Sequence, residues 1–130
     1  MSFSVWIQDV DYSSIVDKTV KTAPPVIKLL KSHNWRVHLD RFDSSTRAGM
    51  DTCPPVLGLT EDTYGDWMRI LPDHDGAFTL TWECSLAGKG ENRIHLSGER
   101  KRAHHQLTET AIQHFVARDI EWLNENLTGD

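Results

Sequence analysis

Seven histidines are the residues in this 130-residue chain most able to hold a metal ion. Their spacing argues against a zinc site, because HExxH, CxxC and His-x-His are all absent. His104 and His105 are adjacent, so on a helix their side chains would point about 100° apart and could not easily share one ion. We therefore predict histidines that are solvated or hydrogen-bonded within the fold, and neither a metal site nor any other cofactor.

Nucleophilic chemistry has little support in the sequence. A reactive thiolate needs positive charge or a helix N-terminus nearby, and the neighbours Asp51 and Thr52 supply neither to Cys53. Cys84 ends the apolar side of an expected strand, so it is predicted to be a core residue. A Gly-x-Ser-x-Gly elbow and a P-loop are absent, and Asp73–Gly76 lacks the acids of a calcium loop. The sequence predicts no catalytic residue and favours a non-enzymatic protein.

Charge is sorted into blocks along the chain. Residues 40–75 hold eight acids and three arginines, a balance of −5 that equals the net charge of the whole protein. Residues 89–102 hold five bases, Lys89 among them, and two acids, Glu91 and Glu99. An acidic patch attracts a basic partner and speeds its association. The net negative charge argues against general nucleic-acid binding, although Arg100–Arg102 could form a local basic contact.

Aromatic residues lie among these acids. Interface hot spots favour Trp, Tyr and Arg within a polar surround that excludes water. Small acidic inhibitors of nucleases place carboxylates where the enzyme expects phosphates, and toxin-neutralising immunity proteins are commonly small, acidic, cytoplasmic single domains. We predict a non-enzymatic protein-binding domain, most concretely an immunity or inhibitor protein that neutralises a basic effector such as a toxin or nuclease. The predicted contact residues are Glu61, Asp62, Tyr64, Asp66, Trp67, Arg69, Asp73 and Asp75.

The plainer interpretation of Glu61, Asp62 and Asp66 is a solvated acidic cluster. Acid–base catalysis would need a carboxylate whose pKa is tuned by burial. The neighbouring Thr60, Thr63–Gly65 and the acids themselves instead predict an exposed loop. In that loop the three carboxylates would face solvent or a partner.

These residues must be positioned by strands, which period-two alternation of apolar residues predicts in several places. At the N-terminus, Phe3, Val5 and Ile7 face one way while Ser4, Trp6 and Gln8 face the other. Trp35, Val37 and Leu39 alternate in the same manner with polar neighbours. The expected strands cover 3–10, 35–42, 56–59, 67–71, 77–84 and 92–97.

Helices are predicted where apolar residues recur at intervals of three and four. One helix is expected at 25–33 after two prolines, a weak helical pattern covers 11–21, and 43–52 is expected to be a loop. A long last helix should run from near His105 to Leu127. The resulting order predicts one α+β domain over residues 1–130: a single antiparallel sheet of about five strands, N-terminal helices, and the long C-terminal helix on one face.

This element order resembles that of helix-grip (START-like) domains, in which the last helix lies across a curved sheet and closes a ligand cavity. The resemblance implies an alternative function, a small-molecule binding protein or enzyme with its pocket between the sheet and the C-terminal helix. The aromatic residues that would line that pocket are Phe78, Trp82, Phe115 and Trp122.

Location and redox state are predicted from absences. No segment approaches the roughly twenty apolar residues of a membrane span, and the N-terminal residues do not have the pattern of a secretory signal. We therefore expect a cytoplasmic protein that does not enter the membrane. In that reducing compartment the two widely spaced cysteines are predicted to be free thiols.

Overall fold

The computed structural model of the chain describes residues 1–88, 90 and 92–129. Lys89 and Glu91 of the basic block therefore lie outside the described residues. The predicted α+β class is confirmed, with one antiparallel sheet of six strands in place of about five. The elements in chain order are β1 (Phe3–Gln8), β2 (Ser14–Val20), α1 (Pro24–Ser32), α2 (Trp35–Arg47), β3 (Val56–Glu61), β4 (Trp67–Pro72), β5 (Phe78–Ala87), β6 (Arg93–Ala103), α3 (His105–Val116) and α4 (Ile120–Asn126).

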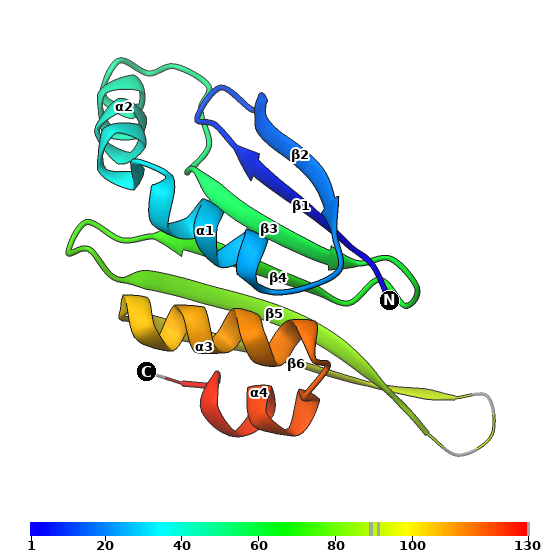
Figure 1. Cartoon of the computed structure of the whole chain (residues 1–130). Helices are drawn as coiled ribbons and strands as arrows, with labels where there is room; N and C mark the ends of the chain where they lie inside the picture. Colours follow the sequence, from blue (N-terminus) through cyan, green and yellow to red (C-terminus); the bar gives the residue numbers. More distant parts are fainter. Residues whose placement is uncertain (89, 91, 130) are drawn as a thin grey trace.

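The strands lie in the order β2-β1-β3-β4-β5-β6, and each neighbouring pair is antiparallel. Three of the helices, α1, α3 and α4, lie against one face of this sheet, while α2 stands at one end of the strands (Figure 1). The opposite face carries no helix in the part of the chain that the structure describes. The sheet therefore has one covered face and one open face.

The hydrophobic core lies between the covered face and the helices. Phe3, Val5 and Ile7 are buried there, which confirms the alternation predicted for the first strand. Phe3 meets Phe115 of α3 at a ring-centroid distance of 5.8 Å. Trp82 is fully buried, and its indole N–H donates to the carbonyl oxygen of Leu127 at 2.8 Å. Each buried aromatic removes about 150–250 Å² of surface from water, so these rings dominate the core.

The strand predicted at 35–42 is wrong, and so is the loop at 43–52, because both belong mainly to α2. Trp35 and Leu39, four residues apart, are buried on one side of this helix. Val37, which strict alternation would bury with them, is 49% exposed. Asn34 caps the helix, since its side chain accepts from the backbone N–H of Val37 at 3.2 Å. Three apolar residues were too few to separate a period of two from one of 3.6.

The weak helical pattern at 11–21 is also wrong, because Ser14–Val20 forms β2 and pairs with β1. Cross-strand partners point to the same side of a sheet. Val16, Lys18 and Val20 therefore share the covered side with their β1 partners Ile7, Val5 and Phe3. The lysine in the middle of this row hid the alternation. Such a charge is common on an edge strand, which solvent can reach.

The single long C-terminal helix is wrong in one respect: it is broken into α3 and α4. The predicted stripe does face the core, and Ile112, Ile120 and Leu123 are buried. The break lies at Ala117–Asp119, where Arg118 takes a left-handed backbone conformation with φ 55°. Asp119 then caps α4, because its carboxylate accepts from the backbone N–H of Trp122 at 3.2 Å. The chain turns here and α4 packs beside α3.

Candidate functional site

The open face of the sheet is formed by the side chains that alternate with the core residues of β1 and β3–β5. Cross-strand pairs place these side chains in rows, for example Trp6 beside Gly58 and Gly58 beside Arg69. We call this surface the open sheet face. Its residues are Ser4, Trp6, Gln8, Val56, Gly58, Thr60, Trp67, Arg69, Leu71, Thr79, Thr81 and Glu83.

Trp6 lies flat on the sheet because its neighbour has no side chain. A Cβ atom at Gly58 would overlap the Trp6 ring atoms Cε2 and Cζ2. Beside this ring is a groove of about 480 Å³, whose lining includes Val56, Arg69 and Leu71. The sequence placed Trp6 on this side of β1, but it did not indicate the glycine that seats the ring, because the β1–β3 pairing joins segments about fifty residues apart.

Trp67 and Arg69, two of the predicted contact residues, stand together on the open sheet face. The Arg69 guanidinium carbon lies 4.8 Å from the centroid of the Trp67 ring, within reach of a cation–π interaction. Trp67 is half-buried and Arg69 is exposed. Across the sheet, Trp67 is opposite Glu83 of β5. This combination of Trp, Arg and a nearby carboxylate is typical of an interface centre.

Asp62 lies at the rim of this face and is exposed. Its carboxylate accepts hydrogen bonds from the hydroxyls of Ser2 at 2.6 Å and Ser4 at 2.8 Å. These hydrogen bonds, that of Ser2 first, lower the pKa of Asp62 below its ordinary value. The carboxylate therefore stays ionised at neutral pH, in a fixed position. Ser4 itself belongs to the open sheet face, so the rim charge is joined directly to it.

Glu61 and Asp66 do not lie in an exposed loop, and that expectation is wrong: their exposed fractions are 0% and 4%. Arg118 pairs with both carboxylates, with Nη2 at 2.8 Å from Asp66 Oδ2 and Nη1 at 3.8 Å from Glu61 Oε2. Burial by itself would raise the pKa of Glu61. Hydrogen bonds from the backbone N–H groups of Tyr64 and Thr63, together with the Arg118 charge, outweigh burial and lower it. These two acids hold the β3–β4 turn against the α3–α4 connection.

Tyr64 covers this buried cluster from outside. Two guanidinium groups contact its ring, with Arg93 at 4.2 Å and Arg118 at 4.6 Å from the centroid. Both arginines also donate to the backbone oxygen of Ser85, at 3.1 and 3.0 Å. Sequence reasoning missed Arg93 and Arg118, because they come from segments far along the chain. Tyr64 thus contacts two arginines, one of which, Arg118, is itself neutralised by the buried Asp66 and Glu61.

Asp73 and Asp75 lie apart from the other predicted contact residues. They belong to the turn after β4, whereas Asp62 and Tyr64 belong to the turn before it. Six residues of strand separate the two turns, a distance of about 20 Å. Asp73 accepts from the Thr79 hydroxyl at 3.2 Å, and Asp75 accepts from the Ala77 backbone N–H at 3.0 Å. Asp73 therefore borders the open sheet face at the end opposite Asp62, through Thr79, whereas no contact joins Asp75 to that face.

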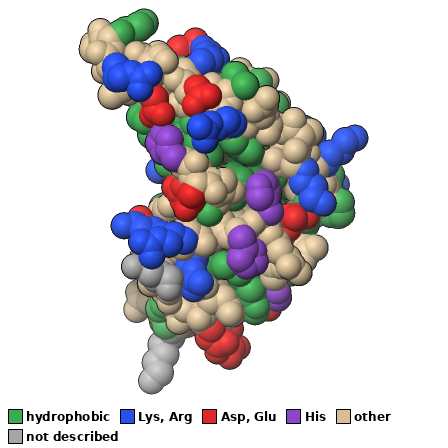
Figure 2. Space-filling model, turned by 90° about the vertical axis from the view of Figure 1, so that its left-hand side faces the viewer, with side chains coloured by type: hydrophobic (Ala, Val, Ile, Leu, Met, Phe, Trp, Pro, Cys, Tyr) green, Lys and Arg blue, Asp and Glu red, His purple; other side chains and the backbone are tan. Residues whose placement is uncertain are grey.

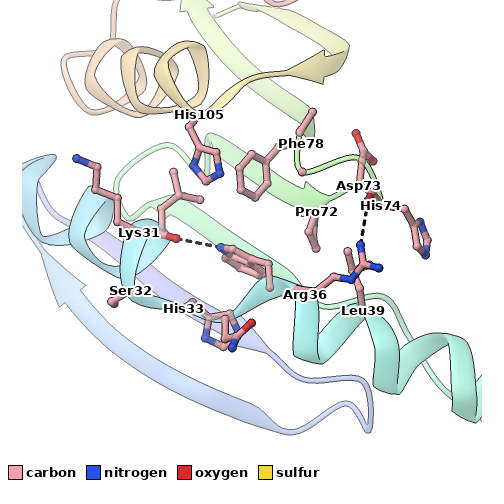
Figure 3. A pocket seen from close by; sticks show the side chains of 15 residues that line it. Lys31, Ser32, His33, Arg36, Leu39, Pro72, Asp73, His74, Phe78 and His105 are labelled. Atoms are coloured by element: carbon pink, nitrogen blue, oxygen red, sulfur yellow. Dashed lines mark hydrogen bonds between the residues drawn. The ribbon is translucent and has the colours of Figure 1, made fainter.

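A second hollow, of about 470 Å³, lies between the α1–α2 junction, the β4–β5 turn and the start of α3. Aromatic rings form its wall (Figure 3). Trp35 meets Phe78 at 6.0 Å between centroids, and Phe78 meets His105 at 5.0 Å, both edge to face. His33 packs on Trp35 at 4.4 Å. Phe78 was proposed to line a ligand cavity, but this hollow opens at the beginning of α3 and not beneath its length.

The charged groups around this hollow are already paired. Arg36 donates to the carbonyl oxygen of His74 at 3.2 Å, and His74 contacts the Asp43 carboxylate at 2.8 Å. Lys31 forms an ion pair with Glu109 at 3.2 Å. Burial, then the charge of His38, lowers the pKa of His33, which favours its neutral form. Figure 2 views this end of the molecule and shows histidine, basic and acidic side chains intermixed. The hollow offers aromatic surface with little net charge.

The other residues proposed for a ligand cavity form core or surface contacts. Trp82 and Phe115 are buried in the core cluster. Trp122 is partly buried, packs against that core and stacks on His114 with 4.0 Å between ring centroids. Over residues 1–88, 90 and 92–129, no group of three or more His, Cys, Asp or Glu side chains could hold a metal ion.

Comparison of the chain with protein-family models, with curated proteins and with solved structures finds no match. Among the helices of the described residues, none is both long and apolar enough to cross a bilayer.

Proposed function

We propose that this protein is a non-enzymatic protein-binding domain that contacts its partner through the open sheet face. In its most concrete form it is a cytoplasmic immunity or inhibitor protein that neutralises a basic effector. The observation that carries the proposal is that two tryptophans, Trp6 of β1 and Trp67 of β4, lie on the same sheet face, which no described helix covers. Tryptophan provides a large contact area at low cost in conformational entropy, and it leads the residues found at interface hot spots.

Electrostatics support a basic partner. Asp62 is fixed at the rim, and Glu83 lies on the face itself, opposite Trp67. Asp17, on the neighbouring β2, is exposed and opposite Trp6. The open sheet face itself holds one arginine, Arg69, whose guanidinium lies over the Trp67 ring. Such a rim raises the rate of encounter with a basic surface, and salt weakens the effect.

The test is affinity capture of a partner from the native lysate at low and high salt, followed by binding measurements with the purified partner. Trp67→Ala should weaken binding by about 2 kcal/mol, the threshold for a hot spot. The double variant Asp62→Lys, Glu83→Lys should slow association and reduce its salt dependence. Circular dichroism should show that all variants stay folded.

The matched control for Asp62→Lys alone is Asp75→Lys, which makes the same charge change at the far end of β4, away from the open sheet face. We expect its affinity and association rate to stay close to those of the unchanged protein. Loss of binding in Asp75→Lys, with none in the open-face variants, would move the site to the β4–β5 turn and refute the proposal.

The alternative function, small-molecule binding, is favoured by the aromatic hollow of about 470 Å³, because ligand pockets are commonly 300–1,000 Å³. Its accessible surface suits a small, weakly charged ligand against His33 and His105, since Trp35 and Phe78 are themselves almost fully buried. A fragment screen followed by NMR tests it: shifts confined to these rings would support a ligand site. Shifts confined to Trp6 and Trp67 would favour the open sheet face.

A further inference from the structure

The two edges of the sheet differ in how they are protected. At one edge, Arg100 of β6 forms a parallel bridge with Gly129, so the end of the chain covers part of that strand. At the other edge is β2, which pairs only with β1 among the described residues. Figure 1 shows β2 at the border of the sheet with no element beyond it. An uncovered edge strand presents backbone N–H and C=O groups that another strand can pair with.

Basic residues gather beside this edge. From residue 18 to residue 39 the chain has four lysines, one arginine and no acid. Lys18 lies on β2 and points to the helix-covered side, since it is opposite the buried Val5. A groove of about 470 Å³ runs between it and α1, and its lining includes Lys28, Pro25 and Leu29. Within the described chain only Lys31 of these lysines has an ion-pair partner, Glu109.

We infer that the β2 edge binds an extended acidic segment of a partner protein, which adds to the sheet as a further strand. The free backbone groups of β2 supply the hydrogen bonds, as in other cases of strand addition. Alternate side chains of the added strand would point to the helix side, toward Lys18 and Lys28. Carboxylates at those positions would be attracted by both lysines, while their aliphatic carbons rest against Leu29.

Charge also argues against a second copy of this chain as the occupant. In the fully overlapping antiparallel register, self-pairing of β2 would put Asp17 opposite Asp17. Of the two registers next to it, one puts Lys18 opposite Lys18, and the other, centred on Val16, avoids both repulsions. Like charges directly opposite one another destabilise a strand pair. A strand with acids on its helix-side positions meets no such repulsion at Lys18. The inference is independent of the open sheet face, which lies on another surface and has the opposite charge.

The test uses a blocked peptide, Ac-TEVEVET-NH2, in which every glutamate lies on one side of an extended strand. We expect binding to the full-length protein that weakens with salt, together with slower amide hydrogen exchange in β2. The double variant Lys18→Glu, Lys28→Glu should bind at least about tenfold more weakly, which corresponds to about 1.4 kcal/mol. The matched control for Lys18→Glu alone is Lys101→Glu, which makes the same charge change on the opposite edge strand and should bind as before.

Two N-methylated forms of the peptide separate strand addition from simple charge attraction. Each carries N-methyl groups on a different alternate set of residues, so only one form keeps free the N–H groups that face β2. Strand addition requires that one form binds and the other does not. Equal binding of both forms, no binding of the unmodified peptide at millimolar concentration, or unchanged affinity of Lys18→Glu, Lys28→Glu would each overturn the inference. Binding of phosphatidylserine vesicles without peptide binding would overturn it in favour of a lipid surface.

Discussion

Two tryptophans on adjacent strands show how differently the faces of this sheet are used. Trp82 lies on the covered face, fully buried, with its indole N–H bonded to the Leu127 carbonyl oxygen. Trp67, on the next strand, lies on the open face, half-buried, with Arg69 over its ring. The same residue type thus closes a core on one side and remains available on the other. Aromatic content alone could not have assigned these two positions.

The largest expected effect is the difference in stability between alanine variants of these two tryptophans. Trp82→Ala should lower the free energy of unfolding by about 4 kcal/mol, because it leaves a cavity and removes a buried hydrogen bond. Trp67→Ala should lower it by about 1 kcal/mol or less, as expected for a partly exposed side chain. Urea unfolding followed by circular dichroism measures both. Equal losses in the free energy of unfolding would mean that Trp67 on the open face stabilises the fold as much as Trp82 on the covered face.

The next largest effect is the difference in stability between variants of two adjacent carboxylates, at the end of β3 and in the turn after it. Glu61→Gln should lower the free energy of unfolding by about 3 kcal/mol, because Arg118 would lose a buried charged partner. Asp62→Asn, one residue further on and exposed, should cost about 0.5 kcal/mol or less. A small loss in Glu61→Gln would show that Asp66 alone satisfies Arg118.

Lowering the pH should also reveal how much the Glu61 carboxylate stabilises the fold. The pKa of Glu61 in the folded protein lies below its ordinary value of 4.5. A carboxyl of this kind stabilises the fold above its unfolded-state pKa, and that stability is lost as the pH falls through the folded-state value. Stability should therefore decrease as the pH is lowered below about 4.5, and the decrease should be shallower in Glu61→Gln. Parallel pH curves for the two proteins would contradict this account.

Gly58→Ala tests the seat of Trp6 on the open face. The added methyl group overlaps the indole, so we expect a loss of about 2 kcal/mol from overpacking. In a Trp6→Ala background the same change should cost almost nothing, because the overlapping ring is gone. A double-mutant cycle measures this coupling. If Gly58→Ala lowered the free energy of unfolding equally in both backgrounds, its effect would come from another contact of β3 and not from the Trp6 ring.

The smallest expected difference concerns the two thiols. Burial raises the pKa of Cys84, on the covered face, to about 12, so it should not react with a thiol reagent at neutral pH in the folded protein. Cys53 is half-buried and borders the groove on the open face. We expect a colorimetric assay to detect reaction at Cys53 alone until urea unfolds the chain. Equal reaction rates for Cys53 and Cys84 would mean that the covered face opens readily to solvent.

Much of the sheet could be predicted from the sequence. In long segments such as Phe78–Cys84, apolar residues alternate often enough to fit the period of a strand and not that of a helix. Short segments could not be assigned in this way. Trp35, Val37 and Leu39 fit a strand by alternation, and the opposing signal is a single residue, Asn34, which caps the helix. The break at Arg118 was hidden because the apolar stripe continues in register through it.

The candidate site was only partly predictable, for a different reason. Trp67 and Arg69 are two apart on one strand, so alternation places them on the same face. Trp6 joins them through the pairing of β1 with β3, which local sequence does not encode. Glu61 was read as exposed from its polar neighbours, but the residue that buries its charge, Arg118, lies more than fifty positions away.

The position of β1 has a consequence for the order of folding. It pairs with β2 within about ten residues, but its other neighbour, β3, begins only at Val56. During synthesis the β1–β2 hairpin therefore leaves the ribosome with the inner edge of β1 unpaired, while two helices are still to come before β3. That edge is the most exposed to aggregation until β3 arrives. Formation of the β1–β3 pair closes the long segment between these two strands, and this step should limit the folding rate. Mutations in β1 and β3 should therefore slow folding more than mutations in α2.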